Sequence, residues 1–236
     1  MKAEYISHMG DDLLVVNAAR VSFSKESGWA TNWAGDPDGL LAQDEKLITY
    51  LAKHGHWTPF SHPQIMMREK VPIFVARQRF KHMVGFTYNE VSRRYVDDEP
   101  EFFIPNTWRS RPEGSVKQGS GDEVVHELDS DFIFPEVGNL GWADNPSDAY
   151  QEYLYIAEGL YRNMLNSGIA PEQARMVLPQ SMYTEYYVTG SLSAWARAYK
   201  QRIDAHAQVE IQDLARSWEE IIRPLFPESW SALTNE

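Results

Sequence analysis

The chain has 236 residues, enough for one substantial core, and its 43% hydrophobic and 13% aromatic content is that of a folded globular protein. It contains no cysteine, which excludes disulfides, thiolate catalysis and cysteine-ligated metal sites. Its formal net charge of -12 argues against general binding to DNA or RNA, because such binding rests on many Lys and Arg contacts to phosphate.

The first forty residues predict one short element followed by a loop. Asp12 to Val16 is a candidate for a short strand or for the entry to a helix, and it leads into the segment NAARVSF. Arg20 in that segment could do no more than close a surface ion pair. The Gly-, Asp- and Ser-rich run from Ser24 to Gly39 predicts a loop.

A helix is predicted from Gln43, where apolar residues recur at helical spacing. Asp44 is placed to cap its start, and Gly55 to end it in a left-handed conformation. The segment HGHWTPFSH follows. Its histidines could mark a zinc site or only a helix end and turn. No cysteine or paired carboxylate completes a ligand set nearby, so we expect no metal.

Gln64 to Val71 predicts a strand, which leads through Pro72 into the segment PIFVARQRFKHMVGFTYNEVSRRY. Pro72 suits the first turn of a helix, and in this predicted helix two pairs of polar residues lie one turn apart and form one contiguous patch of donors. These pairs are Arg77 with Lys81, and Gln78 with His82.

After the break expected at Gly85, the same segment carries Asn89, Glu90, Ser92, Arg93 and Arg94. Cationic donors followed by carboxamide, carboxylate, hydroxyl and guanidinium groups suit a phosphorylated small molecule such as a nucleotide. A solvated helix face is the alternative. Local positive charge in a chain of net charge -12 favours the anion site.

Residues 106–147 are rich in Pro, Gly, Ser and acidic residues, with scattered aromatic residues and no helical or strand period. We interpret them as a surface insertion, which could cover the site, within a single domain spanning 1–236. A boundary between two domains is the alternative.

The remaining chain predicts three helical stretches. One runs from Ala149 to Gly168, and we expect its apolar positions in the core: Tyr153, Ile156, Ala157, Leu160, Tyr161, Met164 and Leu165. The segment PEQARMVLPQSMYTEYYVTG follows, in which Arg175 must reach either solvent or an anion. A second helix should end at Arg202, and a third, amphipathic helix should span 207–222.

Separated blocks of this chain resemble, in the same order, the signatures of the flavin-dependent thymidylate synthase family. HGHWTPFSH is similar to its His-Gly-His-x-Thr-Pro-Phe-x-His, and RQRFKHM with NEVSRRY is similar to its Arg-Gln-x-x-Arg-His-Arg with Asn-Glu-x-Ser-x-Arg-Tyr. ARMVLP and RIDAHAQ match two further blocks. Met83 replaces the last arginine of the second block, and the interval to Ser92 is one residue longer. Ser191 and Ser193 replace an Asn-x-Arg.

The resemblance implies a mixed α+β fold, in which helices flank an antiparallel or mixed sheet, and a homotetramer whose sites draw on several subunits. The sequence starts with no basic stretch followed by an apolar run and has no long apolar span, so we expect a cytoplasmic protein. The lack of a G-x-G-x-x-G fingerprint is consistent with a non-Rossmann flavin site. The implied reaction is reductive methylation of dUMP to dTMP by a methyltransferase that uses FAD, with NADPH and 5,10-methylenetetrahydrofolate as co-substrates. No nucleic-acid or membrane partner is expected.

Site residues follow from the same resemblance. Arg202 is the expected catalytic residue, because without a cysteine the uracil ring must be activated electrostatically, and a guanidinium can stabilise the ring anion. The implied contacts to dUMP are Gln78, Lys81, Glu90, Ser92, Arg94, Arg175 and Arg202. The implied contacts to FAD are His56, Thr58, Lys81, His82, Asn89, Glu90, Ser191, Ser193, Arg197 and His206.

Two other classes of function remain open at this point. A nucleotide-binding protein that has lost catalysis would be consistent with the changes at Met83, Ser191 and Ser193. A nucleic-acid-binding regulator would need a basic surface that this composition does not favour.

Overall fold

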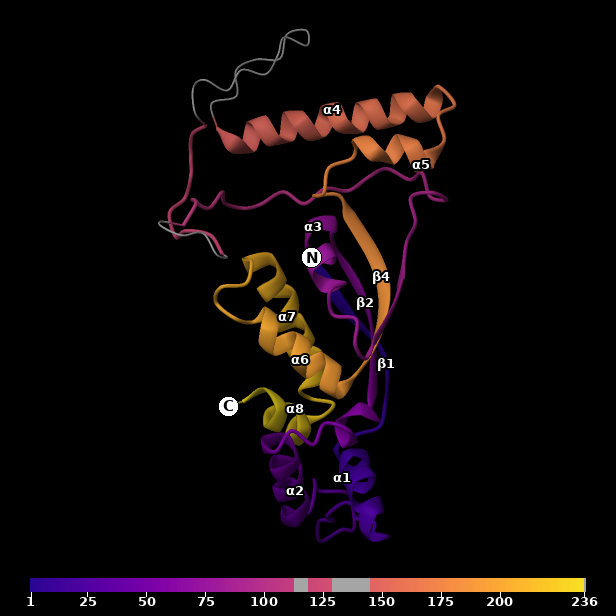
Figure 1. The fold of residues 1–236 in the computed structure, drawn as a ribbon, viewed down its shortest axis with the longest axis vertical. Helices are drawn as coiled ribbons and strands as arrows, with labels where there is room; N and C mark the ends of the chain where they lie inside the picture. The colour runs from indigo at the N-terminus through magenta and orange to yellow at the C-terminus, as the bar shows by residue number, and fades with distance from the viewer. Residues whose placement is uncertain (113–118, 129–144, 236) are drawn as a thin grey trace. The chain divides into compact units, whose positions relative to one another are not determined.

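The computed structural model describes residues 1–112, 119–128 and 145–235 (Figure 1). These residues form two compact units, each with its own internal packing. The first contains 1–71, 77–90 and 185–235, and the second contains 72–76 and the described residues between 91 and 184. The expected single domain therefore stays a prediction, and much of the expected insertion lies outside the described residues.

A four-stranded sheet of order β1-β2-β4-β3 organises the chain. Its strands are β1 (Lys2–Met9), β2 (Gln64–Pro72), β3 (Phe86–Glu90) and β4 (Tyr183–Ser191). β1 is antiparallel to β2, and β3 is antiparallel to β4. The Leu192 N–H donates to the Pro63 carbonyl at 3.1 Å, which brings the end of β4 beside the start of β2.

β2 and β4 show the same alternation of buried and more exposed residues, because successive side chains of a strand point to opposite faces. Each strand continues directly into a helix. β2 is followed by α3 (Ile73–Arg79), and β4 by α6 (Leu192–Arg202). The strand expected at 64–71 and the helix expected to end at Arg202 are confirmed.

The first unit also contains several helices. They are α1 (Asp12–Arg20), α2 (Ala42–Lys53), α6, α7 (Val209–Ile222) and α8 (Pro227–Thr234), with the short turns η1 (Val21–Phe23) and η2 (Pro59–Ser61). α6 packs on α7 and α8, α2 packs on α8, and α7 contacts β1 (Figure 1). Three tryptophans are fully buried in this unit: Trp195, Trp218 and Trp230.

The second unit contains α4 (Pro146–Asn166), α5 (Pro171–Ala174) and η3 (Arg175–Val177), and α4 packs on the other two. Aromatic residues connect α4 to the preceding chain. The Trp108 indole N–H donates to the Ser147 hydroxyl at 3.0 Å, and the Tyr150 hydroxyl donates to the Phe103 carbonyl at 2.9 Å.

Of the two alternatives for Asp12 to Val16, the helix entry is confirmed, because these residues begin α1, while β1 and α8 were not predicted. Two other local expectations were wrong. Asp44 does not cap α2: it is buried in the first turn and accepts hydrogen bonds from Arg20 and Ser27, so Arg20 closes a largely buried ion pair. On α4, Ala157 and Tyr161 are buried, but Tyr153, Ile156 and Leu160 are exposed.

The largest correction concerns α3. The strand β2 includes Pro72, and the helix ends at Arg79, so Lys81 and His82 lie in the turn that follows. The expected one-turn pairing with Arg77 and Gln78 does not form. The last residue of the helix, Arg79, has a fully buried side chain, and the chain leaves the helical conformation directly after it.

Candidate active site

The end of α6 meets the turn after α3 at Arg202. Its Nε donates to Nε2 of His82 at 2.8 Å, and its Nη2 donates to the Gln78 carbonyl at 3.0 Å. The Gln78 side chain is itself held by Gln208, whose Oε1 accepts from Nε2 at 2.6 Å. A guanidinium has five N–H groups, and the structure shows no partner among the described residues for the other three. They remain available to a ligand.

His82 is held in its neutral form. Burial, together with the positive charges of Arg202, Arg79 and Arg197, lowers its pKa to about 4. Because Arg202 can only donate, Nε2 of His82 must be the acceptor, and the single ring proton lies on Nδ1. The imidazole therefore fixes Arg202 without neutralising its charge.

Positive charges lie close together around the contact between Arg202 and His82. Burial lowers the pKa of the Arg202 guanidinium, and the nearby Arg79 lowers it further. Repulsion between cations in a partly desolvated place would be relieved by an anionic ligand. The site is thus suited to stabilising negative charge on a bound molecule.

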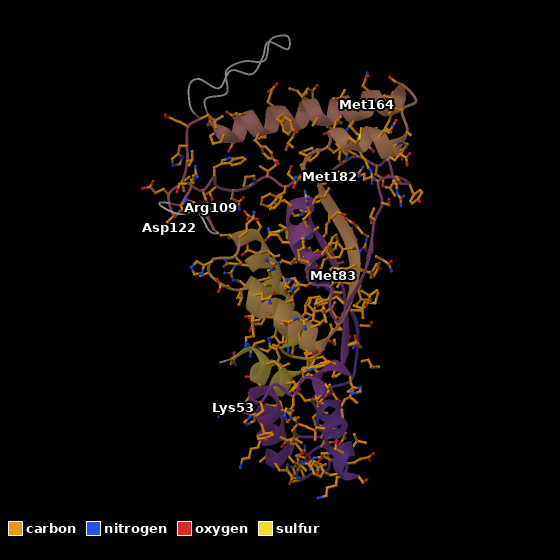
Figure 2. All side chains as sticks on the ribbon, in the orientation of Figure 1. Lys53, Met83, Arg109, Asp122, Met164 and Met182 are labelled. Carbon is orange, nitrogen blue, oxygen red and sulfur yellow. The ribbon has the colours of Figure 1, made fainter. Side chains whose placement is uncertain are left out.

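The turn from Lys81 to Gly85 is anchored on α6. Arg197 donates to the Val84 carbonyl, and the Ser191 N–H donates to the Gly85 carbonyl at 3.1 Å. Gly85 has φ +80, and a Cβ added to it would lie 2.8 Å from the Cβ of Ala194. Met83, labelled in Figure 2, is 74% exposed near the turn's tip. These contacts give the longer interval before Ser92 a defined conformation.

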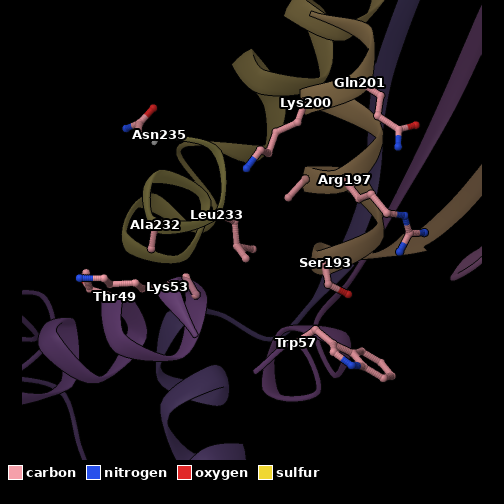
Figure 3. Close-up of a pocket in the computed structure, with 12 residues that line it drawn as sticks. Thr49, Lys53, Trp57, Ser193, Arg197, Lys200, Gln201, Ala232, Leu233 and Asn235 are labelled. Carbon is pink, nitrogen blue, oxygen red and sulfur yellow. The ribbon is translucent and has the colours of Figure 1, made fainter. Parts of the chain in front are cut away.

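A pocket of about 860 Å³ lies between α2, α6 and α8 (Figure 3), and Arg197, which donates to the turn, is part of its lining. Its polar and aromatic lining includes Lys53, Trp57, Ser193, Arg197, Lys200 and Asn235. Three cations from two helices line one concave surface in an acidic chain. Such a surface suits an anionic ligand with an aromatic part.

Hydroxyl groups fill the start of α6. The Ser193 hydroxyl lies 2.7 Å from that of Ser61 and 3.2 Å from that of Ser191. Ser191 also caps the helix, because its side chain accepts from the Ala194 N–H at 3.3 Å. Ser193 faces the pocket, whereas Ser191 is buried and used by the helix.

A second pocket, of about 340 Å³, lies under the turn and is lined by Phe80, Met83, Phe86, Tyr88 and Glu90. Its walls are largely aromatic, and Glu90 supplies a carboxylate. Asn89 and Glu90 end β3 with exposed side chains, and Lys81 is exposed on the turn.

The other expected residues of the first unit lie at the surface. His56 is exposed and meets the Tyr50 ring edge-on, with the ring centroids 6.0 Å apart. Thr58 is exposed just before η2. His206 is exposed and hydrogen-bonded to Asp204 at 3.0 Å. None of these contacts joins them to Arg202.

Three of the residues expected to bind dUMP belong to the second unit. Arg94 donates from Nε to the Ser92 hydroxyl at 3.4 Å, and both are near the surface. Arg175 is exposed, with Nε donating to the Glu172 carbonyl at 3.3 Å. Their roles toward dUMP therefore remain predictions from the resemblance.

Sequence reasoning missed several residues of these sites. Lys200 could have been found, because it lies three positions after Arg197 and shares its helix face. Lys53 and Trp57 come from other segments, so only the fold brings them to α6. Arg79 offered no signal at all, since its burial depends on partners distant in sequence.

Comparison with known proteins decides the family. The family model described as Thymidylate synthase complementing protein matches residues 4–228. The flavin-dependent thymidylate synthase of Thermosipho africanus is 35% identical over 96% of this chain and 88% of its own length. That of Thermus thermophilus is 34% identical over 96% of this chain and 73% of its own. The chain belongs to the flavin-dependent thymidylate synthase family.

A solved structure is similar over almost the whole chain. The UMP/dUMP methylase PolB from Streptomyces cacaoi, bound with 5-Br dUMP, matches with a TM-score of 0.72 and 28% identity, covering 99% of this chain and 94% of that one. The predicted family, mixed fold and methyltransferase class are confirmed. The described part of the chain holds no helix of the length and apolarity needed to cross a membrane.

Proposed function

We propose that this member of the flavin-dependent thymidylate synthase family methylates C5 of the uracil ring of dUMP to give dTMP. The carbon donor is 5,10-methylenetetrahydrofolate, and NADPH reduces the FAD. One observation carries the proposal: a cationic Arg202, held by a neutral His82, has N–H groups left for a ligand that gains negative charge.

Arg202 activates the ring electrostatically. A chain without cysteine cannot form a covalent thioether with the uracil, so the developing ring anion must be stabilised by fixed charge. The planar guanidinium can face the N3 and O2 edge of the ring with two parallel donors. Because His82 and the Gln78 carbonyl already orient it, little reorganisation is needed as charge develops.

The large pocket fits a flavin dinucleotide. Lys53, Arg197 and Lys200 offer cationic donors for a diphosphate, and Trp57 offers an aromatic surface for stacking. Ser193, expected from the resemblance, adds a hydroxyl. When bound, reduced flavin supplies the hydride that no side chain of this protein can supply.

The remaining partners rest on the resemblance. It assigns dUMP contacts to Gln78, Lys81, Glu90, Ser92, Arg94 and Arg175. Besides Ser193 and Arg197, it assigns flavin contacts to His56, Thr58, Lys81, His82, Asn89, Glu90, Ser191 and His206. PolB, 28% identical to this chain, was crystallised with 5-Br dUMP, which supports dUMP as the substrate. A cytoplasmic homotetramer with shared sites, in which each chain is a single domain, belongs to the same proposal.

An absorbance spectrum of the purified protein, followed by anaerobic addition of NADPH, tests this function. We expect a flavin spectrum that NADPH bleaches, and dTMP formation that requires both dUMP and methylenetetrahydrofolate. A protein that binds dUMP yet forms no dTMP under these conditions would be a noncatalytic nucleotide-binding protein instead. Failure of FAD to copurify or to bind when added would refute the flavin assignment.

A further inference from the structure

An ion pair is completely buried beneath the active site. The side chains of Glu69, on β2, and Arg79, at the end of α3, are both 0% exposed, and Nε of Arg79 lies 3.2 Å from Oε2 of Glu69. The guanidinium is enclosed by aromatic rings, with its Cζ 4.4 Å from the ring centroid of Phe86 and 4.7 Å from those of Trp195 and Trp218. A buried pair seldom stabilises a fold more than apolar residues would, so it raises the question of a second role.

Tyr88 connects this pair to the active-site turn. Its hydroxyl accepts from Nη1 of Arg79 at 2.6 Å and lies 2.7 Å from the carbonyl oxygen of His82. Because arginine can only donate, the hydroxyl proton is directed to that carbonyl. The His82 N–H in turn donates to the Arg79 carbonyl at 3.1 Å. Both backbone polar groups of His82 are thus held by Arg79, one directly and one through Tyr88.

We propose that Glu69, Arg79 and Tyr88 act as a positioning relay that sets the orientation of His82 and, through it, of Arg202. Glu69 fixes the guanidinium of Arg79, Arg79 fixes the Tyr88 hydroxyl, and that hydroxyl holds the His82 backbone. The His82 ring then meets Nε of Arg202 at 2.8 Å. The family resemblance assigns none of the three relay residues to the active site.

The buried network could position His82 or could only pack the core, and a comparison of Tyr88 with Tyr186 distinguishes these two roles. The hydroxyl of Tyr186 donates to the same Oε2 of Glu69 at 2.6 Å, and its ring lies beside that of Phe80. Tyr186 makes no hydrogen bond with His82 or Arg202, so it shares the buried network without reaching the active site. Tyr88→Phe and Tyr186→Phe each remove one hydroxyl from that network and keep the aromatic ring.

The first experiment measures His82 directly. Nitrogen NMR of the imidazole should show the proton on Nδ1 in the wild-type protein and in Tyr186→Phe. In Tyr88→Phe the ring is released, so we expect the tautomer preference to weaken and the pKa of His82 to rise toward its usual value. Equal spectra in the two variants would overturn the relay.

The second experiment measures dUMP binding by calorimetry and rests on the proposed function. We expect Tyr88→Phe to weaken dUMP binding about tenfold, the effect of disturbing one hydrogen bond to a charged group, and Tyr186→Phe to change it less than about twofold. In a His82→Ala background the effect of Tyr88→Phe should vanish, because the relay acts through His82. Persistence of the full effect there would contradict the proposal.

The two proposals fail in distinguishable ways. A wild-type protein that binds no dUMP would refute the proposed function, while the NMR comparison would still decide whether Tyr88 orients His82. Conversely, normal dUMP methylation by the wild type, together with an unchanged His82 in Tyr88→Phe, would refute the relay alone.

Discussion

The two strand-to-helix connections of the sheet share a beginning and differ in their ends. β2 and β4 have the same alternation of burial, and each passes directly into a helix. α6 continues for 11 residues and delivers Arg202 from its last turn, whereas α3 stops after 7 residues at Arg79. The long helix therefore presents a cation, and the short one gives way to a turn whose His82 holds that cation. A helix that ends early can contribute as much to a site as one that continues.

The largest expected effect tests why α3 ends where it does. Arg79→Leu leaves Glu69 buried without its ionic partner, so we expect the free energy of unfolding to fall by about 3–5 kcal/mol. Chemical denaturation measures this. Arg68→Leu is the matched control, because Arg68 lies on β2 and forms an ion pair with Glu185 while its own side chain is 45% exposed. Its loss should cost about 0–1 kcal/mol. Similar losses in both variants would mean that burial does not define the end of α3.

Arg202→Ala tests the corresponding end of α6. We expect kcat for dTMP formation to fall by about 10²–10³, the cost of removing one preorganised donor for a developing anion. Thermal unfolding should change little, because the side chain makes only two hydrogen bonds with the described residues. Arg216→Ala on α7 removes an arginine that is 52% exposed and should leave the rate unchanged. A near-normal rate in Arg202→Ala would refute its catalytic role.

Gly85→Ala tests the turn that separates the two regions. The new side chain would adopt φ +80 and meet Ala194, so we expect a loss of about 1–3 kcal/mol in the free energy of unfolding. Gly55→Ala provides the comparison: Gly55 has φ +68 with nothing within 4 Å of an added Cβ, so it reports the backbone strain without the contact. A smaller loss at Gly85 than at Gly55 would show that the turn is not anchored on α6.

The last expected effect is a dependence on pH. The pKa of His82 is about 4 in the folded protein, below its usual value near 6.5, so the folded state binds fewer protons between these values. The contribution of His82 to stability is therefore complete above about pH 6.5 and decreases as the pH falls toward 4. Denaturation of the wild type and of His82→Gln across this range isolates the slope. An NMR titration midpoint of His82 near 6.5 would contradict it.

The spacing of apolar residues predicted those elements whose buried face can be recognised from their own sequence. β2 and α6 alternate or repeat so regularly that their inward faces could be read without knowing their neighbours. α3 could not, because Arg79 looks like one more basic residue until Glu69 and the two tryptophans of α6 and α7 surround it. Asp44 misled for the same reason, since its partner Arg20 is 24 residues away.

In the candidate site, too, the sequence predicted some features and not others. The resemblance supplied the identities of Arg202, His82 and Arg197, and the structure brings these three to one turn. Their roles toward one another were not predicted: His82 was expected as a donor beside Gln78, and it is an acceptor for Arg202. That role depends on the desolvation of the ring, which a sequence motif does not contain.

One buried contact in the first unit joins two helices that lie far apart in the sequence. The buried carboxylate of Asp12 accepts from the N–H groups of Glu228 and Ser229, each at 2.9 Å, at the start of α8. α8 also packs against α1, α2 and α6. The carboxylate of Asp12 is therefore satisfied only once a helix that lies 216 residues further along the chain has been synthesised and has packed against α1. A chain interrupted between α1 and α8 would leave this carboxylate without both partners and would remove the helix that covers α1 and α2.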